Sequence, residues 1–215
     1  SSTSRGLGDV YKRQLLLFFK KHSEIIVMDI GVPVKDLGEI DVAPLRDAIL
    51  GIDDQAWFEN NHRQTEYDVH AQTQSLMMLF VDTEVWPSVK VTREAAWDEL
   101  SEVAMPLMDS ILEKFYPPGG KVIRAMAAKL LSGGVIKPHT DKHQSFHVGH
   151  RIHIPITANP RVRFMIDGRP HKFEVGRVYE LNNQIQHSVI NKGTDDRINF
   201  IFDYVPPDQL AKLAS

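Results

Sequence analysis

The pattern of apolar and polar positions changes along the chain, from helical spacing in the first part to alternation in the second. A long stretch that starts with Thr92 carries apolar side chains at helical spacing up to Phe115. This pattern predicts an amphipathic helix capped by Thr92 and kinked or divided at Pro106. A shorter helix is expected to begin at Asp41 and to stop at Gly51.

From Lys121 onward, apolar residues recur at every second position, which is the period of a half-buried strand. The expected strands are 76–81, 122–131, 151–157, 161–166, 178–181, 187–190 and 197–204. Many short strands at close spacing predict a sandwich or a barrel. The fold class expected is therefore mainly β, with N-terminal helices packed on one outer sheet face.

The strand expected at 197–204 shows the alternation most clearly. Ile198, Phe200 and Phe202 form an apolar face that can pack under the helices. Arg197 and Asp203 belong to the opposite face, which can line a cavity.

Composition excludes several classes of site. The chain has 215 residues, 42% of them hydrophobic and 25% charged, and a formal net charge of -3. This charge disfavours a general nucleic-acid binder, which usually carries a basic excess. The chain contains no cysteine, so disulfides, zinc ribbons, iron–sulfur clusters and thiol nucleophiles are excluded. A tightly bound metal would need histidine and carboxylate ligands.

Residues 1–14 have no periodicity and resemble translated adaptor sequence, so we expect a non-native or disordered tail. Residues 15–215 are expected to form one domain, with its β-rich core at about 121–205. No apolar run has the length of a membrane span, and the run 15–19 is too short for a signal-peptide core. A cytoplasmic monomer is the default expectation.

His139 and Asp141 form an H-x-D pair, whose side chains point to the same side of an extended segment. His187 opens a later strand and can supply a third ligand. Two imidazoles and one carboxylate on one face of an ion form the facial triad of non-haem Fe(II) oxygenases, which leaves other positions open. Because H-x-D spacing often arises by chance, the assignment depends on the residues around it.

Arg197 follows His187 by ten residues, and we expect the two on adjacent strands of one hairpin. A guanidinium inside a barrel needs an anion. A dicarboxylate that chelates the metal at one end and pairs with Arg197 at the other would meet that need. The equally weighted alternative is a structural arginine paired with Asp195, Asp196 or Asp203.

Arg151 and His153 alternate with isoleucines on the strand after the H-x-D pair. If the isoleucines fill the core, these two residues face the cavity. The alternative is an edge strand whose polar face lies in water. His143 and His147 lie in the loop beside the pair, where they can contact substrate or serve as ordinary polar loop residues.

Five segments together resemble the aspartyl/asparaginyl (and proline) β-hydroxylase family of 2-oxoglutarate oxygenases. They are GGVIKPHTD at 133–141, HRIHIPIT at 150–157, YELNN at 179–183, HSVIN at 187–191 and RINFIFDY at 197–204. The resemblance implies a double-stranded β-helix (jelly-roll, cupin-like) barrel that uses Fe(II), 2-oxoglutarate and O2.

The resemblance also implies roles for individual residues. Arg197 matches the arginine that holds the distal carboxylate of 2-oxoglutarate. Arg151 matches a second basic residue near the cosubstrate, and His153 lies beside it. No catalytic side chain is expected beyond the iron ligands. The three iron ligands implied are His139, Asp141 and His187.

The expected reaction is hydroxylation of an unactivated C–H bond in an amino-acid or peptidyl Asp, Asn or Pro substrate, giving succinate and CO2. One alternative is a cupin-like metalloenzyme that works without 2-oxoglutarate. Another is a non-catalytic metal-binding barrel. Arg197 discriminates the first alternative, which has no need of a dicarboxylate clamp.

Overall fold

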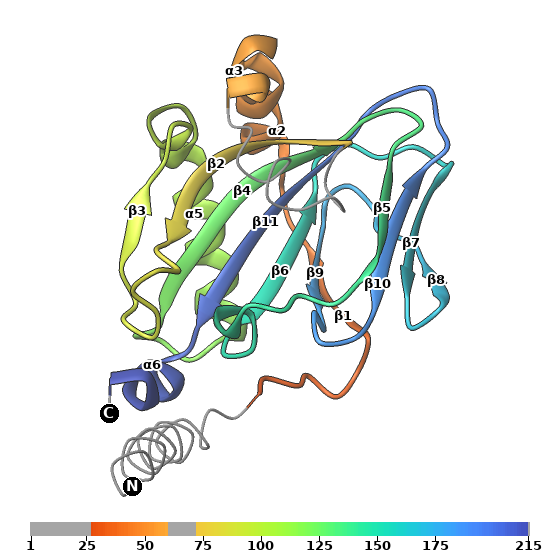
Figure 1. Cartoon of the computed structure of the whole chain (residues 1–215). Coiled ribbons are helices and arrows are strands. Elements are labelled where there is room, and N and C mark those ends of the chain that lie inside the picture. The colour runs from red at the N-terminus through yellow and green to blue at the C-terminus, as the bar shows by residue number, and fades with distance from the viewer. Residues whose placement is uncertain (1–26, 60–71, 215) are drawn as a thin grey trace, which may run out of the picture.

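The computed structural model describes residues 27–59 and 72–214, arranged as two antiparallel sheets with helices outside them (Figure 1). The expected tail at 1–14 lies outside the described residues. The strands are β1 (Val34–Glu39), β2 (Thr73–Val81), β3 (Val91–Arg93), β4 (Lys121–Leu130), β5 (Val135–His139), β6 (His150–Pro155), β7 (Val162–Ile166), β8 (Arg169–His171), β9 (Arg177–Leu181), β10 (His187–Asn191) and β11 (Arg197–Val205). The helices are α2 (Ala43–Gly51), α3 (Asp54–Glu59), α5 (Trp97–Phe115), α6 (Pro207–Ala214) and a short 3-10 helix, Gln144–Phe146. In these ranges, no helix is long and apolar enough to cross a membrane.

The strand order confirms the jelly-roll fold. The seven-stranded sheet has the order β1-β9-β6-β11-β4-β2-β3, and the four-stranded sheet has the order β5-β10-β7-β8. From β4 to β11 the chain passes back and forth between the sheets, apart from the β7–β8 hairpin. Figure 1 shows the small sheet facing the β9, β6 and β11 part of the large sheet. The space between the two sheets is the interior of the barrel.

The alternation along β11 works as expected. Ile198, Phe200 and Phe202 are buried in the main core cluster. The cluster also contains Leu100 and Met108 from α5, which covers the outer face of the large sheet. The opposite face of β11 therefore points between the two sheets.

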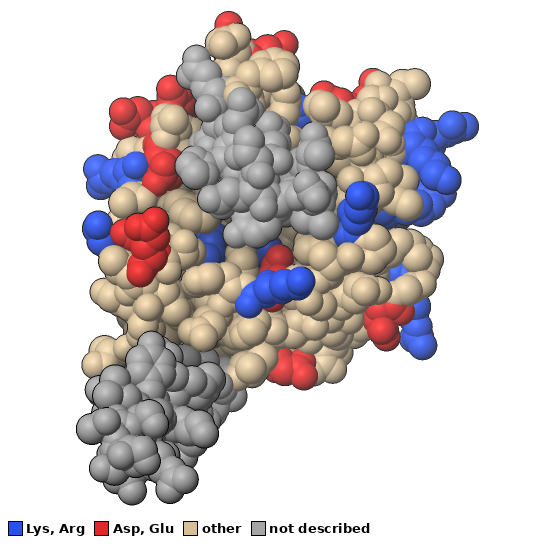
Figure 2. All heavy atoms as spheres, in the orientation of Figure 1, with Lys and Arg blue, Asp and Glu red and all other residues tan. Residues whose placement is uncertain are grey.

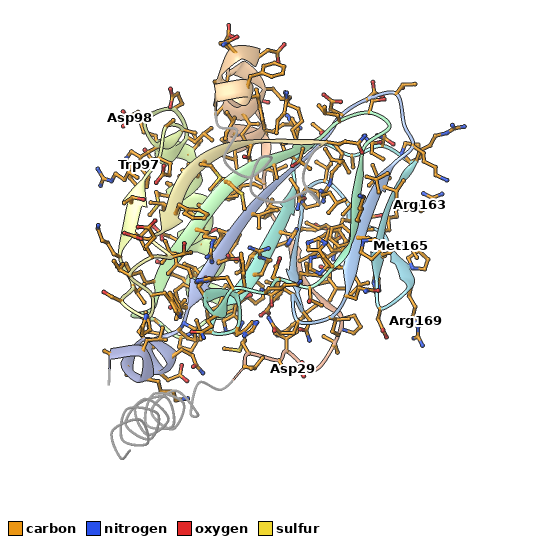
Figure 3. All side chains as sticks on the ribbon, viewed as in Figure 1. Asp29, Trp97, Asp98, Arg163, Met165 and Arg169 are labelled. Carbon is orange, nitrogen blue, oxygen red and sulfur yellow. The ribbon has the colours of Figure 1, made fainter. Side chains whose placement is uncertain are left out.

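The small sheet shows the same two-residue period. Phe164 and Ile166 on β7 are buried in a second core cluster on the interior side. Arg163 and Met165 point away from the interior, and so does Arg169 on the neighbouring strand β8 (Figure 3). Figure 2 shows basic side chains gathered at this edge of the molecule, with acidic and basic side chains mixed elsewhere on the visible face.

The expected start of the long helix was wrong. Thr92 lies in β3, where its hydroxyl donates a hydrogen bond to the carbonyl oxygen of Phe80 at 3.1 Å. The helix α5 begins only at Trp97 and has no side-chain cap. It runs through Pro106 without being divided. Because Pro106 is exposed, the carbonyl that loses its helical hydrogen bond can bind water instead.

The expected hairpin between His187 and Arg197 was also wrong. His187 begins β10 in the small sheet, whereas Arg197 begins β11 in the large sheet, and the two strands do not pair. The side chain of Asn191 donates hydrogen bonds to the carbonyl oxygens of Leu131 and Asp195, at 3.2 and 2.8 Å. These bonds hold a wide corner that carries the chain from one sheet to the other. The ten residues from His187 to Arg197 therefore carry the chain from the small sheet to the large sheet and do not form a tight turn.

Candidate metal and cosubstrate site

The three expected metal ligands lie together at one end of the interior. One ligand atom from each of His139, Asp141 and His187 lies within 4.8 Å of the other two. His139 ends β5 and His187 begins β10, and these two residues are direct partners in the ladder. Their ring centroids are 4.4 Å apart, and Nε2 of His139 lies 3.9 Å from Oδ1 of Asp141. Strand pairing thus brings together candidate ligands that are distant in sequence.

Hydrogen bonds orient both imidazoles for metal binding. Nδ1 of His139 lies 2.8 Å from the carbonyl oxygen of Lys137, and Nδ1 of His187 lies 3.0 Å from that of Ile185. A carbonyl only accepts, so each Nδ1 carries the proton and each Nε2 carries the lone pair that can bind a metal. Burial lowers the pKa of His187, which favours the neutral form that binds a cation.

The carboxylate of Asp141 is held from behind by Arg151. Nη1 of Arg151 donates to Oδ2 of Asp141 at 2.6 Å. Nε and Nη2 of the same guanidinium donate to both oxygens of Asp203, at 2.8 and 3.0 Å. Burial alone would lower the pKa of Arg151, but the two carboxylates raise it above its usual value. Because β6 lies between β9 and β11, the edge-strand alternative for Arg151 and His153 does not apply.

Arg197 is a buried cation in a different situation. Its residue is 5% exposed, and burial lowers the pKa of its guanidinium to about 10. Within the described ranges, no carboxylate forms an ion pair with it, and its Nη2 atom has no hydrogen-bond partner. The ring of Phe164 lies beside the cation, with its centroid 5.7 Å from Cζ. An isolated buried guanidinium is costly unless an anion binds it.

The carboxylates considered as structural partners of Arg197 have other contacts. Asp203 binds Arg151, as described above. Oδ1 of Asp196 accepts a hydrogen bond from the backbone N–H of Ser132 at 2.7 Å. The side chain of Asp195 accepts a hydrogen bond from its neighbour Thr194. The described contacts therefore favour a bound anion over a structural ion pair for Arg197.

His153 places a second unpaired donor in the same interior. Nδ2 of Asn199 lies 2.6 Å from Nδ1 of His153, so Nδ1 accepts and the proton of the neutral ring is on Nε2. Burial lowers the pKa of His153 well below its usual value, and the positive charges of Arg151 and Arg197 lower it further. Nε2 is buried and has no hydrogen-bond partner in the described structure. Two buried donors without acceptors fit an oxygen-rich anionic ligand.

Sequence and structure comparisons agree with this geometry. The family model for aspartyl/asparaginyl β-hydroxylase matches residues 47–207, which is well over half of the chain. The chain belongs to the aspartyl/asparaginyl β-hydroxylase family. As a member of this family, the protein is an enzyme of the 2-oxoglutarate and Fe(II) oxygenase type, as the sequence predicted. A search of curated protein sequences finds no match.

Solved structures share the fold of this β-hydroxylase family member. An oxidoreductase of the 2OG-Fe(II) oxygenase family from Burkholderia pseudomallei aligns with a TM-score of 0.51 and 13% identity, covering 78% of this chain and 91% of that chain. A non-heme monooxygenase, ThoJ, in a nickel complex aligns with a TM-score of 0.51 and 11% identity, covering 81% and 74%. At such identities the likeness concerns the fold alone.

The two loop histidines of this β-hydroxylase family member have local contacts. His143 precedes the short 3-10 helix, and its Nδ1 lies 2.7 Å from Oγ of Ser145. The carbonyl oxygen of His147 accepts a hydrogen bond from the backbone N–H of Met28 at 2.6 Å. Both contacts order the loop beside the candidate metal ligands. A role in substrate binding stays a prediction for both residues.

Two residues at the site, Arg124 and Phe146, were not predicted from the sequence. Arg124 on β4 is fully buried and pairs with Asp203, at 3.2 Å between Nη1 and Oδ2. Phe146 stacks under this guanidinium, with its ring centroid 4.1 Å from Cζ. The alternation along β4 places a charged residue among apolar ones, and that single charge was the available signal for Arg124.

Proposed function

We propose that the protein uses Fe(II), 2-oxoglutarate and O2 to hydroxylate an unactivated C–H bond, giving succinate and CO2. The observation that carries the proposal is Arg197. A buried guanidinium without a described carboxylate partner shares the interior with a cluster of two histidines and one carboxylate. A dicarboxylate cosubstrate is the chemical class that satisfies both features at once.

The donor set fits Fe(II). His139 and His187 would each bind through Nε2, and Asp141 would bind through Oδ1, the oxygen that faces His139. Two neutral imidazoles and one carboxylate are the ligands of the non-haem iron facial triad. When bound, iron with 2-oxoglutarate supplies the activation of O2 that C–H hydroxylation requires.

Three further residues are proposed to bind the cosubstrate. Arg197 would hold the distal carboxylate with its guanidinium, and Nε2–H of His153 offers a second donor. Arg151 uses three of its N–H groups on Asp141 and Asp203. A guanidinium has five N–H donors, so two remain for an oxygen of the cosubstrate.

A stack of aromatic rings closes the interior beside Arg197. The ring centroids of Phe164 and Phe173 are 4.4 Å apart, and those of Phe173 and Tyr179 are also 4.4 Å apart. His153 meets the edges of the first two rings at 5.9 and 6.1 Å. These rings form an apolar wall beside the proposed carboxylate site, and an apolar surrounding strengthens the charge interaction with Arg197.

The proposed substrate is an amino acid or a peptidyl Asp, Asn or Pro side chain, by analogy with the family. His143 and His147 are the candidate contacts. A screen that measures succinate release tests this against free amino acids, Asp- and Asn-containing peptides, proline peptides and fatty acids. Stimulation by an amino acid or a peptide is expected. Stimulation by fatty acids alone would contradict the substrate class.

The cosubstrate can be tested without turnover. Calorimetric titration of 2-oxoglutarate into Zn(II)-loaded protein should show one binding site per chain. Glutarate, which keeps the distal carboxylate but lacks the chelating keto group, should bind more weakly. Absence of 2-oxoglutarate binding to the metal-loaded protein would refute the proposal and favour a metalloenzyme that works without this cosubstrate.

A further inference from the structure

A row of alternating charges crosses the inner face of the large sheet behind the metal cluster. Asp203 on β11 lies directly opposite Arg124 on β4 and Arg151 on β6 in the strand register. Its carboxylate accepts hydrogen bonds from Nε and Nη2 of Arg151, at 2.8 and 3.0 Å, and from Nη1 of Arg124 at 3.2 Å. All three residues are buried, between 2% and 6% exposed. We call these three residues the charge row.

The charge row ends on a metal ligand. Nη1 of Arg151 donates to Oδ2 of Asp141 at 2.6 Å, which leaves Oδ1 on the side of His139. Two N–H groups of the Arg151 guanidinium donate to Asp203, and these two bonds fix the plane of the guanidinium. The third N–H is then aimed at Asp141 with little freedom to turn. Only one oxygen of Asp141 is left to face the metal position.

The other end of the charge row holds the loop that carries Asp141. Nη2 of Arg124 donates to Oγ of Ser145 at 2.5 Å. The ring of Phe146 lies against both guanidiniums, 4.1 Å from Cζ of Arg124 and 4.5 Å from Cζ of Arg151. The segment from Asp141 to Phe146 is therefore tied at both ends to arginines that share one carboxylate.

Asp203 is the junction of these contacts. Burial by itself raises the pKa of Asp203, but Arg151 and Arg124 lower it below its usual value, so the carboxylate stays charged. Removing this charge would leave two buried guanidiniums to compete for Asp141. Arg151 would then lose the contact that sets its orientation.

We propose that Asp203 is a positioning residue for the metal site, which acts through Arg151 to present a single oxygen of Asp141 to the ion. The inference rests on the metal site of the proposed function. Asp203 itself contacts neither the metal ligands' donor atoms nor the proposed cosubstrate carboxylate. Its effect should therefore appear in metal binding even when 2-oxoglutarate is absent.

The test is a double-mutant cycle read out by Co(II) binding in the absence of 2-oxoglutarate. Asp203→Asn should weaken Co(II) binding by about 10- to 100-fold, the usual effect of losing a residue that orients a metal ligand. It should also change the visible d–d spectrum of bound Co(II), because Asp141 can turn. Arg151→Lys keeps the positive charge but cannot hydrogen-bond to two carboxylates in the same way. It should weaken Co(II) binding by about as much as Asp203→Asn does.

Non-additivity is the signature of action through Arg151. In the Arg151→Lys background, Asp203→Asn should weaken Co(II) binding by less than about threefold further. The matched control is Phe202→Leu, on the same strand but in the core under α5. It should lower the unfolding midpoint and leave the Co(II) affinity and spectrum unchanged.

The possible outcomes separate the two claims. Wild-type protein that binds no Co(II) would overturn the metal site and this inference together. Asp203→Asn with wild-type affinity and spectrum, or with the same loss in both backgrounds, would overturn the positioning role alone. If Asp203→Asn does not fold, Asp203→Glu keeps the charge but displaces the guanidinium of Arg151. That variant should show a smaller loss of affinity and a changed spectrum, and an unchanged site would overturn the inference.

Discussion

Replacing Arg197 with methionine should stabilise the ligand-free protein while abolishing 2-oxoglutarate binding. The guanidinium is buried, and in the described structure no carboxylate offsets its charge. Methionine keeps an unbranched side chain as far as the position of Nε and removes the charged end of the guanidinium with its donors. If Arg197 exists to bind an anion, its loss should cost function and not folding.

The size of the effect follows from the pKa of Arg197. Burial lowers that pKa from 12.5 to about 10, which disfavours the charged form by about 3 kcal/mol. The contact with Phe164 offsets about 0.5–1 kcal/mol of this cost. A net gain of about 2 kcal/mol for Arg197→Met raises the unfolding midpoint of a domain of this size by roughly 4–8 °C.

The sign of the pH dependence is also fixed. A cation whose folded pKa is lowered costs stability at every pH below that pKa, and the cost fades as pH rises through about 10. The difference in stability between the wild type and Arg197→Met should therefore be constant from pH 6 to 9 and should shrink at higher pH.

Thermal unfolding of Zn(II)-loaded protein measures both effects. At 2-oxoglutarate concentrations near 100 times Kd, the wild type should gain about 2.7 kcal/mol, and Arg197→Met should gain nothing. Arg163→Met, at the exposed arginine on β7, is the matched control and should respond like the wild type. A ligand-free Arg197→Met that is less stable than the wild type would refute the reasoning, because it would mean that Arg197 already has a stabilising partner. So would a 2-oxoglutarate response equal to that of the wild type.

Three further predictions concern the metal, the charge row and the core. His187→Ala should abolish Co(II) binding in calorimetry while the far-ultraviolet circular dichroism stays unchanged, and retained binding would remove His187 from the ligand set. Because the folded pKa of Asp203 lies below its usual 3.8, the stability it provides is present above that value and is lost as pH falls through the lower folded pKa. Urea unfolding between pH 5 and pH 2 should show a flatter loss for Asp203→Asn than for the wild type, and parallel curves would contradict the pairing. Phe200→Ala should cost about 3–5 kcal/mol in urea unfolding but leave the metal affinity unchanged, since Phe200 lies on the outer face of β11; weaker metal binding would contradict that separation.

Local sequence patterns predicted the parts of the site that lie within single strands. The period of two assigned Arg197 and Asp203 to the inner face of β11, and the structure places both there. The same pattern put His153 on the inner face of β6. These predictions depend only on which side of a strand a residue occupies, and alternation determines that side.

Contacts between residues on different strands could not be predicted from the sequence. Asp203 and Arg124 are 79 residues apart, and their pairing depends on the register between β11 and β4. Whether Arg197 pairs with a carboxylate of the protein or binds an anionic ligand also depends on residues that are distant in sequence and close in space. The helix expected from Thr92 begins further along the chain, because the first residues of that segment pair with β2 as strand β3. Long-range pairing overrode the local helical spacing there.

Conversion of 2-oxoglutarate to succinate in the presence of Fe(II) and O2 tests the central claim most directly. The account predicts one succinate per 2-oxoglutarate consumed by the wild type, with stimulation by an amino-acid or peptide substrate. It predicts no succinate from His187→Ala and a severe loss from the folded Arg197→Met variant at the same 2-oxoglutarate concentration. Iron-loaded wild-type protein that leaves 2-oxoglutarate intact across the substrate panel, or wild-type succinate formation by Arg197→Met, would contradict it.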